Sequence, residues 1–153
     1  MLTIAVESPL SADGLALIAG SETALAEVFR PDEIFTLDPQ QLAVPEIRFF
    51  VARDHGVPVG CVALMHCGGY GEIKRLYVSG KGRGKGTARA LMAALEADAQ
   101  AQGLAVMRLE TGPVLAPAIA LYRSLGYLER GRFGDYADHP ASLFMEKQLG
   151  AAP

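Results

Sequence analysis

The chain is poor in the residues that build disulfide frameworks and zinc sites. Its 153 residues include two cysteines, three histidines and no tryptophan. So few cysteines and histidines provide neither a set of disulfides nor the ligand spacing of a zinc site. His66 precedes Cys67, but no second pair of ligands accompanies them in the sequence. We therefore expect no metal, and we expect Cys61 and Cys67 to be buried, reduced thiols.

Long apolar segments are also missing. The longest, residues 57–65, is much shorter than the roughly 20 residues of a membrane-spanning helix, and Pro58 and Gly60 interrupt it. The first residues, MLTIAVES, have neither the basic region nor the apolar run of a signal peptide. These absences predict a cytoplasmic protein with no membrane partner.

A surplus of basic charge is missing as well. Lysine and arginine number 14 against 17 aspartates and glutamates, and the net charge is −3. A general nucleic-acid-binding protein would have a broad basic surface, so we expect no nucleic-acid partner. Hydrophobic residues make up 50% of the chain, which is enough for the core of one domain over residues 1–150. Residues 151–153 are expected to form a frayed tail.

The order of strand and helix signals predicts an α/β (α+β) fold with a mixed, mostly antiparallel sheet of about six to seven strands flanked by helices. Short turns join the second, third and fourth strands into a meander, and a long helix then leads to the fifth strand. The expected strands span residues 2–7, 47–53, 57–67, 72–78, 104–110, 127–130 and 142–148. The expected helices span residues 13–29, as one or two helices meeting at Gly20 and Ser21, then a turn at 39–43, and finally 84–102 and 118–125.

Alternation along the fourth strand predicts which of its side chains share a face, because successive side chains of a strand point in opposite directions. One face is expected to carry Glu72, Lys74, Leu76 and Val78. The other face is expected to carry Ile73, Arg75 and Tyr77.

The stretch LYVSGKGRGKGTARAL, residues 76–91, carries the clearest functional signal. An apolar strand leads into a loop of alternating glycine and basic residues, and the loop leads into a helix. Glycine lets backbone N–H groups approach a ligand closely, and a helix N-terminus adds unpaired N–H groups and a partial positive charge. Together they form a site for phosphate. The basic side chains of this site are Lys81, Arg83, Lys85 and Arg89.

Two familiar phosphate motifs do not fit the spacing of this loop. A P-loop requires Gly-Lys-Ser/Thr, whereas Lys85 is followed by Gly86. The dinucleotide motif G-x-G-x-x-G fails from Gly80, which places Lys85 at its last position, and from Gly82, which places Thr87 there. A plain basic turn with weak affinity for RNA is a further alternative, but this loop lacks aromatic residues on which bases stack.

A third spacing does fit. Arg83, Gly86 and Ala88 satisfy the pattern Arg/Gln-x-x-Gly-x-Gly/Ala, with LYV before it and ALYRSLGY (residues 120–127) after it. With these motifs in this order, the chain resembles the GCN5-related N-acetyltransferase (GNAT) superfamily over nearly its whole length. The resemblance implies a sheet splayed between the fourth and fifth strands, acetyl-CoA as cosubstrate, direct transfer of acetyl to a primary amine, and a possible homodimer. The alternative is a CoA-binding module without catalysis.

The resemblance also assigns the cofactor contacts. Backbone groups of Leu76, Tyr77 and Val78 are expected to pair with the pantetheine arm, as an added strand would. Leu115 occupies a position where many members have an asparagine that contacts CoA, so that contact is expected to be lost. Loop amides are expected to hold the pyrophosphate, and they belong to Arg83, Gly84, Lys85, Gly86, Thr87 and Ala88.

The same resemblance implies the catalytic residues. Tyr122 matches a helix tyrosine that donates a proton or hydrogen bond to the departing CoA thiolate, which suits a phenol because it is neutral at pH 7. Glu72 matches a glutamate that acts as general base, with Glu110 as the competing candidate. A core position for Tyr122 and pairing of Glu72 with Lys74 or Arg75 are the purely structural interpretations.

The acceptor amine is expected to lie among the N-terminal helices, residues 30–45 and residues 133–140. Acidic side chains in the late loop would suit a cationic amine. An amino acid, a polyamine, an antibiotic, a peptide N-terminus and a protein lysine all remain open as acceptors. The candidate residues for reading the acceptor are Phe133, Asp135, Tyr136, Asp138 and His139.

Overall fold

The computed structural model describes residues 1–150, so the tail predicted at 151–153 lies outside the described residues. Seven strands form one sheet in the spatial order β1-β2-β3-β4-β5-β7-β6. β4 and β5 run parallel, and the other neighbouring strands run antiparallel. The predicted mixed, mostly antiparallel sheet is thus confirmed. The strands are β1 (Leu2–Val6), β2 (Ile47–Asp54), β3 (Val57–His66), β4 (Gly71–Val78), β5 (Val106–Thr111), β6 (Leu128–Arg130) and β7 (Leu143–Gln148).

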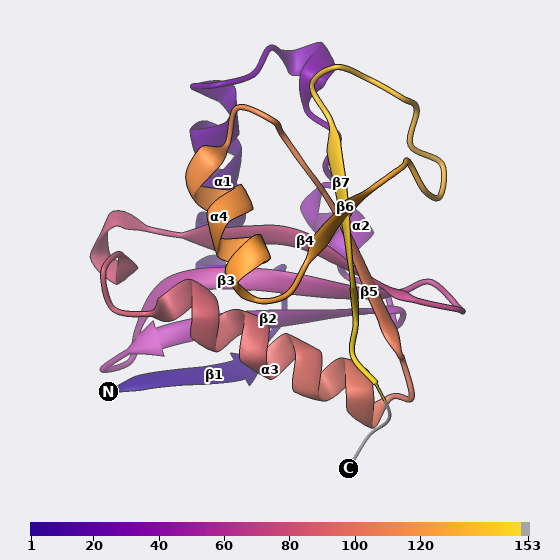
Figure 1. The fold of residues 1–153 in the computed structure, drawn as a ribbon. Helices are drawn as coiled ribbons and strands as arrows, with labels where there is room; N and C mark the ends of the chain where they lie inside the picture. The colour runs from indigo at the N-terminus through magenta and orange to yellow at the C-terminus, as the bar shows by residue number, and fades with distance from the viewer. Residues whose placement is uncertain (151–153) are drawn as a thin grey trace.

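Helices pack on both faces of the sheet (Figure 1). α3 covers β2, β3 and β4 on one side, where Leu91 and Leu95 are fully buried, and α1 covers β3 and β4 on the other side, where Leu17 and Ile18 are buried. No helix within residues 1–150 is both long enough and apolar enough to cross a membrane. The helices are α1 (Ala12–Ala26), α2 (Pro39–Leu42), α3 (Thr87–Ala101) and α4 (Ala116–Ser124), with 3-10 turns η1 (Pro31–Glu33) and η2 (Gly80–Gly82).

α1 is one continuous helix, although its sequence also allowed two. Ser11 caps the N-terminus, because its Oγ accepts a hydrogen bond from the N–H of Gly14 at 3.0 Å. Gly20 serves packing, since a Cβ at this position would lie 2.8 Å from the hydroxyl oxygen of Tyr77 on β4. The glycine therefore lets α1 lie close to the strand that leads into residues 79–86, the loop between β4 and α3 that is called the phosphate loop below.

α3 begins at Thr87 rather than at residue 84 as predicted. Gly84 and Gly86 have φ angles of 75° and 72°, a left-handed conformation that glycine adopts readily and that interrupts a right-handed helix. The hydroxyl of Thr87 is buried and donates a hydrogen bond to the carbonyl of Gly82 at 2.8 Å. The loop is therefore tied to the first turn of the helix that follows it.

A β-bulge in β4 makes the predicted alternation wrong. The register of β4 against β3 shifts next to Arg75, whose φ is 58°. An extra residue of this kind changes the direction of the side chains that follow it. Leu76 and Val78 therefore pack in the same core as Ile73, beneath α3, whereas Arg75 and Tyr77 contact α1 on the other face.

The sheet opens between β4 and β5, as predicted. Residues 71–73 of β4 pair with residues 107–109 of β5, and the pairing ends just before the bulge. Figure 1 shows the two strands diverging from there, with α4 beside the opening. The second half of β4 consequently presents backbone groups to the opening instead of to a neighbouring strand.

Candidate active site

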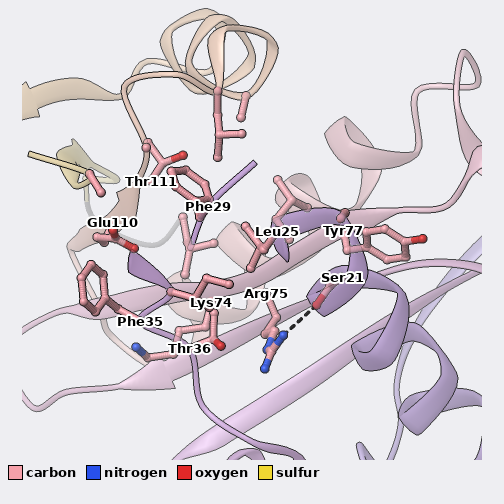
Figure 2. A pocket seen from close by; sticks show the side chains of 18 of the residues that line it. Ser21, Leu25, Phe29, Phe35, Thr36, Lys74, Arg75, Tyr77, Glu110 and Thr111 are labelled. Carbon is pink, nitrogen blue, oxygen red and sulfur yellow. Dashed lines mark hydrogen bonds between the residues drawn. The ribbon is translucent and has the colours of Figure 1, made fainter. Parts of the chain in front are cut away.

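A cavity of about 290 Å³ lies in the opening between β4 and β5. Its walls come from α1 and the segment after it, the bulged part of β4, the end of β5 and α4, with the labelled side chains shown in Figure 2. Leu76 and Tyr77 line the cavity, and so do Glu110 and Tyr122. The opening therefore brings two expected cofactor contacts together with two of the three candidate catalytic residues.

Tyr122 combines deep burial with a position on the cavity wall. The residue is 7% exposed, and its ring meets the ring of Tyr127 edge-on with centroids 5.9 Å apart. Burial raises the pKa of the Tyr122 phenol, and the negative charge of Glu110 raises it further. The phenol consequently stays protonated near neutral pH and can act as a hydrogen-bond donor.

Glu110 is a partly buried carboxyl group at the end of β5. Burial raises its pKa to about 7, and this effect outweighs the lowering by the Ser142 hydroxyl, which donates to Oε2 at 2.8 Å. A group with this pKa accepts and releases a proton close to neutral pH. Glu110 therefore has the protonation behaviour of a general base, together with access to the cavity.

Glu72 pairs with Lys74, as in the purely structural interpretation of the sequence. It is 3% exposed, and its Oε2 accepts hydrogen bonds from Nζ of Lys74 at 2.9 Å and from the hydroxyl of Tyr136 at 2.6 Å. Among residues 1–150 the cavity lining includes Lys74 and Tyr136 but not Glu72. The Glu72 carboxylate thus fastens the loop that contains Tyr136 to β4, from a position behind the cavity wall.

The phosphate loop surrounds a second, more open cavity of about 270 Å³. The lining of this cavity extends from Val78, where β4 ends, to the first turn of α3. Most of the predicted pyrophosphate contacts line it, which places unpaired amides and the positive end of a helix around one space. The lining residues are Val78, Gly82, Arg83, Gly84, Gly86, Thr87, Ala88, Arg89 and Leu121.

Two basic side chains of the loop have partners elsewhere. Nζ of Lys85 lies 2.7 Å from Oδ2 of Asp54, and this contact is the largest cause of the lowered pKa of the Asp54 carboxyl. Lys85 is the one predicted cofactor contact that lines neither of the two cavities described. Arg89 donates a hydrogen bond to Oγ of Ser124 at 2.8 Å, which ties α3 to the end of α4. Arg89 itself lines the second cavity together with Arg83, so two of the four basic residues predicted at the phosphate site lie there.

The acceptor end of the larger cavity differs in part from expectation. α1 and the segment after it line it, as expected, but of the five candidates in the late loop Tyr136 alone is part of the lining formed by residues 1–150. Phe133 is buried against the rings of Tyr70 and Phe144 instead. Side chains missed from the sequence include Leu25, Phe29, Ile34 and Phe35. Their apolar character indicated only core packing, so no local signal distinguished them.

A comparison with known families matches residues 18–127 to the Acetyltransferase (GNAT) family. The chain belongs to this family. Among curated relatives of this acetyltransferase is the "IAA acetyltransferase" of Azospirillum brasilense, which is 45% identical over 150 residues, covering 97% of this chain and 98% of the relative. The resemblance identified from the Arg83–Ala88 loop is thereby confirmed.

Solved structures agree with the family assignment. A candidate acyl-CoA N-acyltransferase from Klebsiella pneumoniae superposes on this acetyltransferase with a TM-score of 0.82 and 38% identity, covering 98% of this chain and 99% of that chain. The PaiA N-acetyltransferase from Thermoplasma acidophilum, solved in complex with coenzyme A, shares the fold at 17% identity, with a TM-score of 0.73, covering 95% of this chain and 99% of that chain.

Proposed function

We propose that this acetyltransferase transfers the acetyl group of acetyl-CoA directly to a primary amine, with Glu110 as general base and Tyr122 as proton donor. The observation that carries the proposal is the single cavity in the β4–β5 opening, which both side chains line. Membership of the GNAT family and a fold neighbour bound to coenzyme A support acetyl-CoA as the donor. In this proposal the pyrophosphate binds at the loop of residues 83–88 and the pantetheine arm extends along the free edge of β4.

The transfer requires one bond to form and one to break. The amine nitrogen attacks the thioester carbonyl, forming the C–N bond, and collapse of the tetrahedral intermediate breaks the C–S bond. Backbone N–H groups of the bulged half of β4 would stabilise the oxyanion. Glu110 accepts the proton that the amine must lose, and the Tyr122 phenol supplies a proton to the departing thiolate.

We assign the base role to Glu110 rather than to Glu72 on two grounds. Glu110 lines the cavity and its pKa is about 7, whereas the Glu72 carboxylate is engaged by Lys74 and Tyr136 behind the wall. We infer that Glu72 positions the loop of Tyr136.

The pH dependence of the reaction distinguishes the two carboxylates. As pH falls through about 7, Glu110 becomes protonated and can no longer accept a proton, so kcat/KM for any accepted amine should fall. Glu110→Gln should remove this acid limb and lower kcat/KM at pH 8 by about 100-fold, a typical contribution of a general base. Glu72→Gln, the matched control, should keep the limb. The assignment is wrong if Glu72→Gln loses the limb and Glu110→Gln retains it.

A further inference from the structure

We infer that the acceptor of this acetyltransferase is a small monoamine with an apolar body and without a carboxylate. The inference rests on the proposed function, and it concerns the part of the cavity beyond the thioester. Two properties of this part of the cavity support the inference. One is the size and chemistry of its walls, and the other is the number of charged side chains there that have no ionic partner.

The walls around the acceptor end are mostly apolar. Leu25 and Phe29 come from the end of α1 and the residues after it, and Ile34, Phe35 and Leu37 come from the segment that follows η1. Figure 2 shows Leu25, Phe29 and Phe35 around the space in which Glu110 and Lys74 also lie. An apolar group placed there would be removed from water on several sides, which favours binding in proportion to the area buried.

The space also restricts the size of the acceptor. Its volume of about 290 Å³ lies at the lower end of the range for small-molecule pockets, and the proposed thioester arm occupies part of it. The ring of Phe35 meets the ring of His139 edge-on with centroids 5.4 Å apart, so the segment after η1 touches the late loop across the acceptor end. A folded peptide or protein surface would have to separate these two segments, whereas a compact molecule would not.

The cations of the lining are already neutralised. Nζ of Lys74 pairs with Glu72 at 2.9 Å, and Nη2 of Arg75 pairs with Glu22 at 2.8 Å. Figure 2 shows Arg75 directed toward Ser21, to which its Nη1 donates a hydrogen bond at 2.8 Å. A carboxylate on the acceptor would therefore find no unpaired cation among the described lining residues, and burying it unpaired would be costly.

The described lining also contains two acids, Glu33 and Glu110. Glu33 accepts a hydrogen bond from the backbone N–H of Arg30 at 2.9 Å and lies 3.6 Å from its guanidinium. Glu110 has only the neutral hydroxyl of Ser142 as its hydrogen-bond donor within residues 1–150. One carboxylate without an ionic partner matches one ammonium, so the second and third ammonium groups of a polyamine would have no partner in the cavity.

A panel of four acceptors tests this inference on the full-length enzyme with acetyl-CoA. The panel comprises phenethylamine, phenylalanine, spermidine and a lysine-containing peptide blocked at its N-terminus. Phenethylamine and phenylalanine differ only by the carboxylate, so their ratio isolates the charge argument. We expect kcat/KM for phenethylamine to exceed each of the other three by about tenfold or more, as expected when a buried charge has no partner. A higher value for any of the other three overturns the inference.

A variant of the wall provides the second test. Phe35→Ala should lower kcat/KM for phenethylamine by about tenfold, because the ring contributes apolar contact area, while the value for ethylamine should change little. Val44→Ala is the matched control, since Val44 and Phe35 are both 37% exposed and Val44 lies outside the lining. Equal losses for phenethylamine and ethylamine in Phe35→Ala would contradict the inference.

The outcomes separate the inference from the proposed function. Efficient acetylation of phenylalanine, spermidine or the peptide would leave the acetyl-transfer mechanism in place and remove only the acceptor class. Acetyl-CoA binding, measured by calorimetry, without acetylation of any of the four acceptors or of ethylamine would count against both.

Discussion

At the scale of single residues, Tyr122 and Tyr127 show how two neighbouring phenols acquire different chemistry. Their rings are in edge contact, yet the hydroxyl of Tyr127 donates to Glu96 at 2.8 Å, whereas Tyr122 lines the cavity. Burial raises the pKa of both phenols, so both remain protonated. What distinguishes them is access to the proposed thioester site.

Removing each hydroxyl in turn tests this distinction. Tyr122→Phe should lower kcat by about 100-fold, because the departing thiolate loses its proton donor, and should leave CoA affinity nearly unchanged. Tyr127→Phe is the matched control. It should lower the free energy of unfolding by about 2 kcal/mol, the loss of one buried hydrogen bond to a charged group, and leave kcat unchanged. Steady-state kinetics and chemical denaturation measure the two effects, and equal kcat values for the two variants would remove Tyr122 from the mechanism.

At the scale of elements, the phosphate loop and α3 form one unit. The same helix has a left-handed glycine at each end, Gly86 before it and Gly103 after it, with φ angles of 72° and 81°. A Cβ at either position would meet no heavy atom within 4 Å. A side chain would therefore cause backbone strain at both ends, but only Gly86 lines the proposed pyrophosphate site.

This symmetry provides a controlled test of the loop. Gly86→Glu should weaken CoA binding by about 100-fold or more, because a carboxylate would stand against the pyrophosphate. Gly103→Glu carries the same charge and a similar strain of about 1 kcal/mol at the other end of the helix, and it should bind CoA normally. Calorimetric titration with CoA compares them, and thermal unfolding confirms that both variants fold. Comparable CoA affinity in the two variants would contradict a pyrophosphate site at the loop.

At the scale of the whole molecule, the opening divides the sheet into two parts. β1 to β4 form one part and β5, β7 and β6 the other, and within residues 1–150 only residues 71–73 and 107–109 pair across the division. A ligand bound in the opening would contact both parts. It would also supply partners for the backbone groups of β4 that point toward the opening.

Amide hydrogen exchange can detect this bridging. Saturating CoA should slow exchange at the amides of residues 74–78 that face the opening by about tenfold or more, because binding suppresses local opening there. The amides that pair β2 with β3 in the middle of the first part should change much less and serve as the internal control. Protection confined to α3 and the phosphate loop would show that the pantetheine arm does not bind along β4.

Most of the fold could be predicted because its signals are local. Periodicity and turn residues identified the order of all seven strands and the long helix, and the Arg83–Ala88 spacing identified the family. The start of α3 was predicted too early, because the left-handed φ angles of Gly84 and Gly86 are a property of the folded loop and not of its sequence pattern. The faces of β4 were predicted wrongly after Lys74, since a bulge depends on how β3 pairs with it.

The sequence was enough to predict the loop proposed to bind the cofactor, the order of the elements and the candidate tyrosine, because each depends on residues close together in the chain. Which carboxylate reaches the cavity depends on packing between segments that are distant in the chain. The Glu72 carboxylate accepts hydrogen bonds from Lys74 and from Tyr136 of a distant loop. Glu110 accepts a hydrogen bond from the equally distant Ser142 and is buried without an ionic partner within residues 1–150. Burial and pairing between distant segments set the pKa and the access of a side chain, and neither can be read from its immediate neighbours.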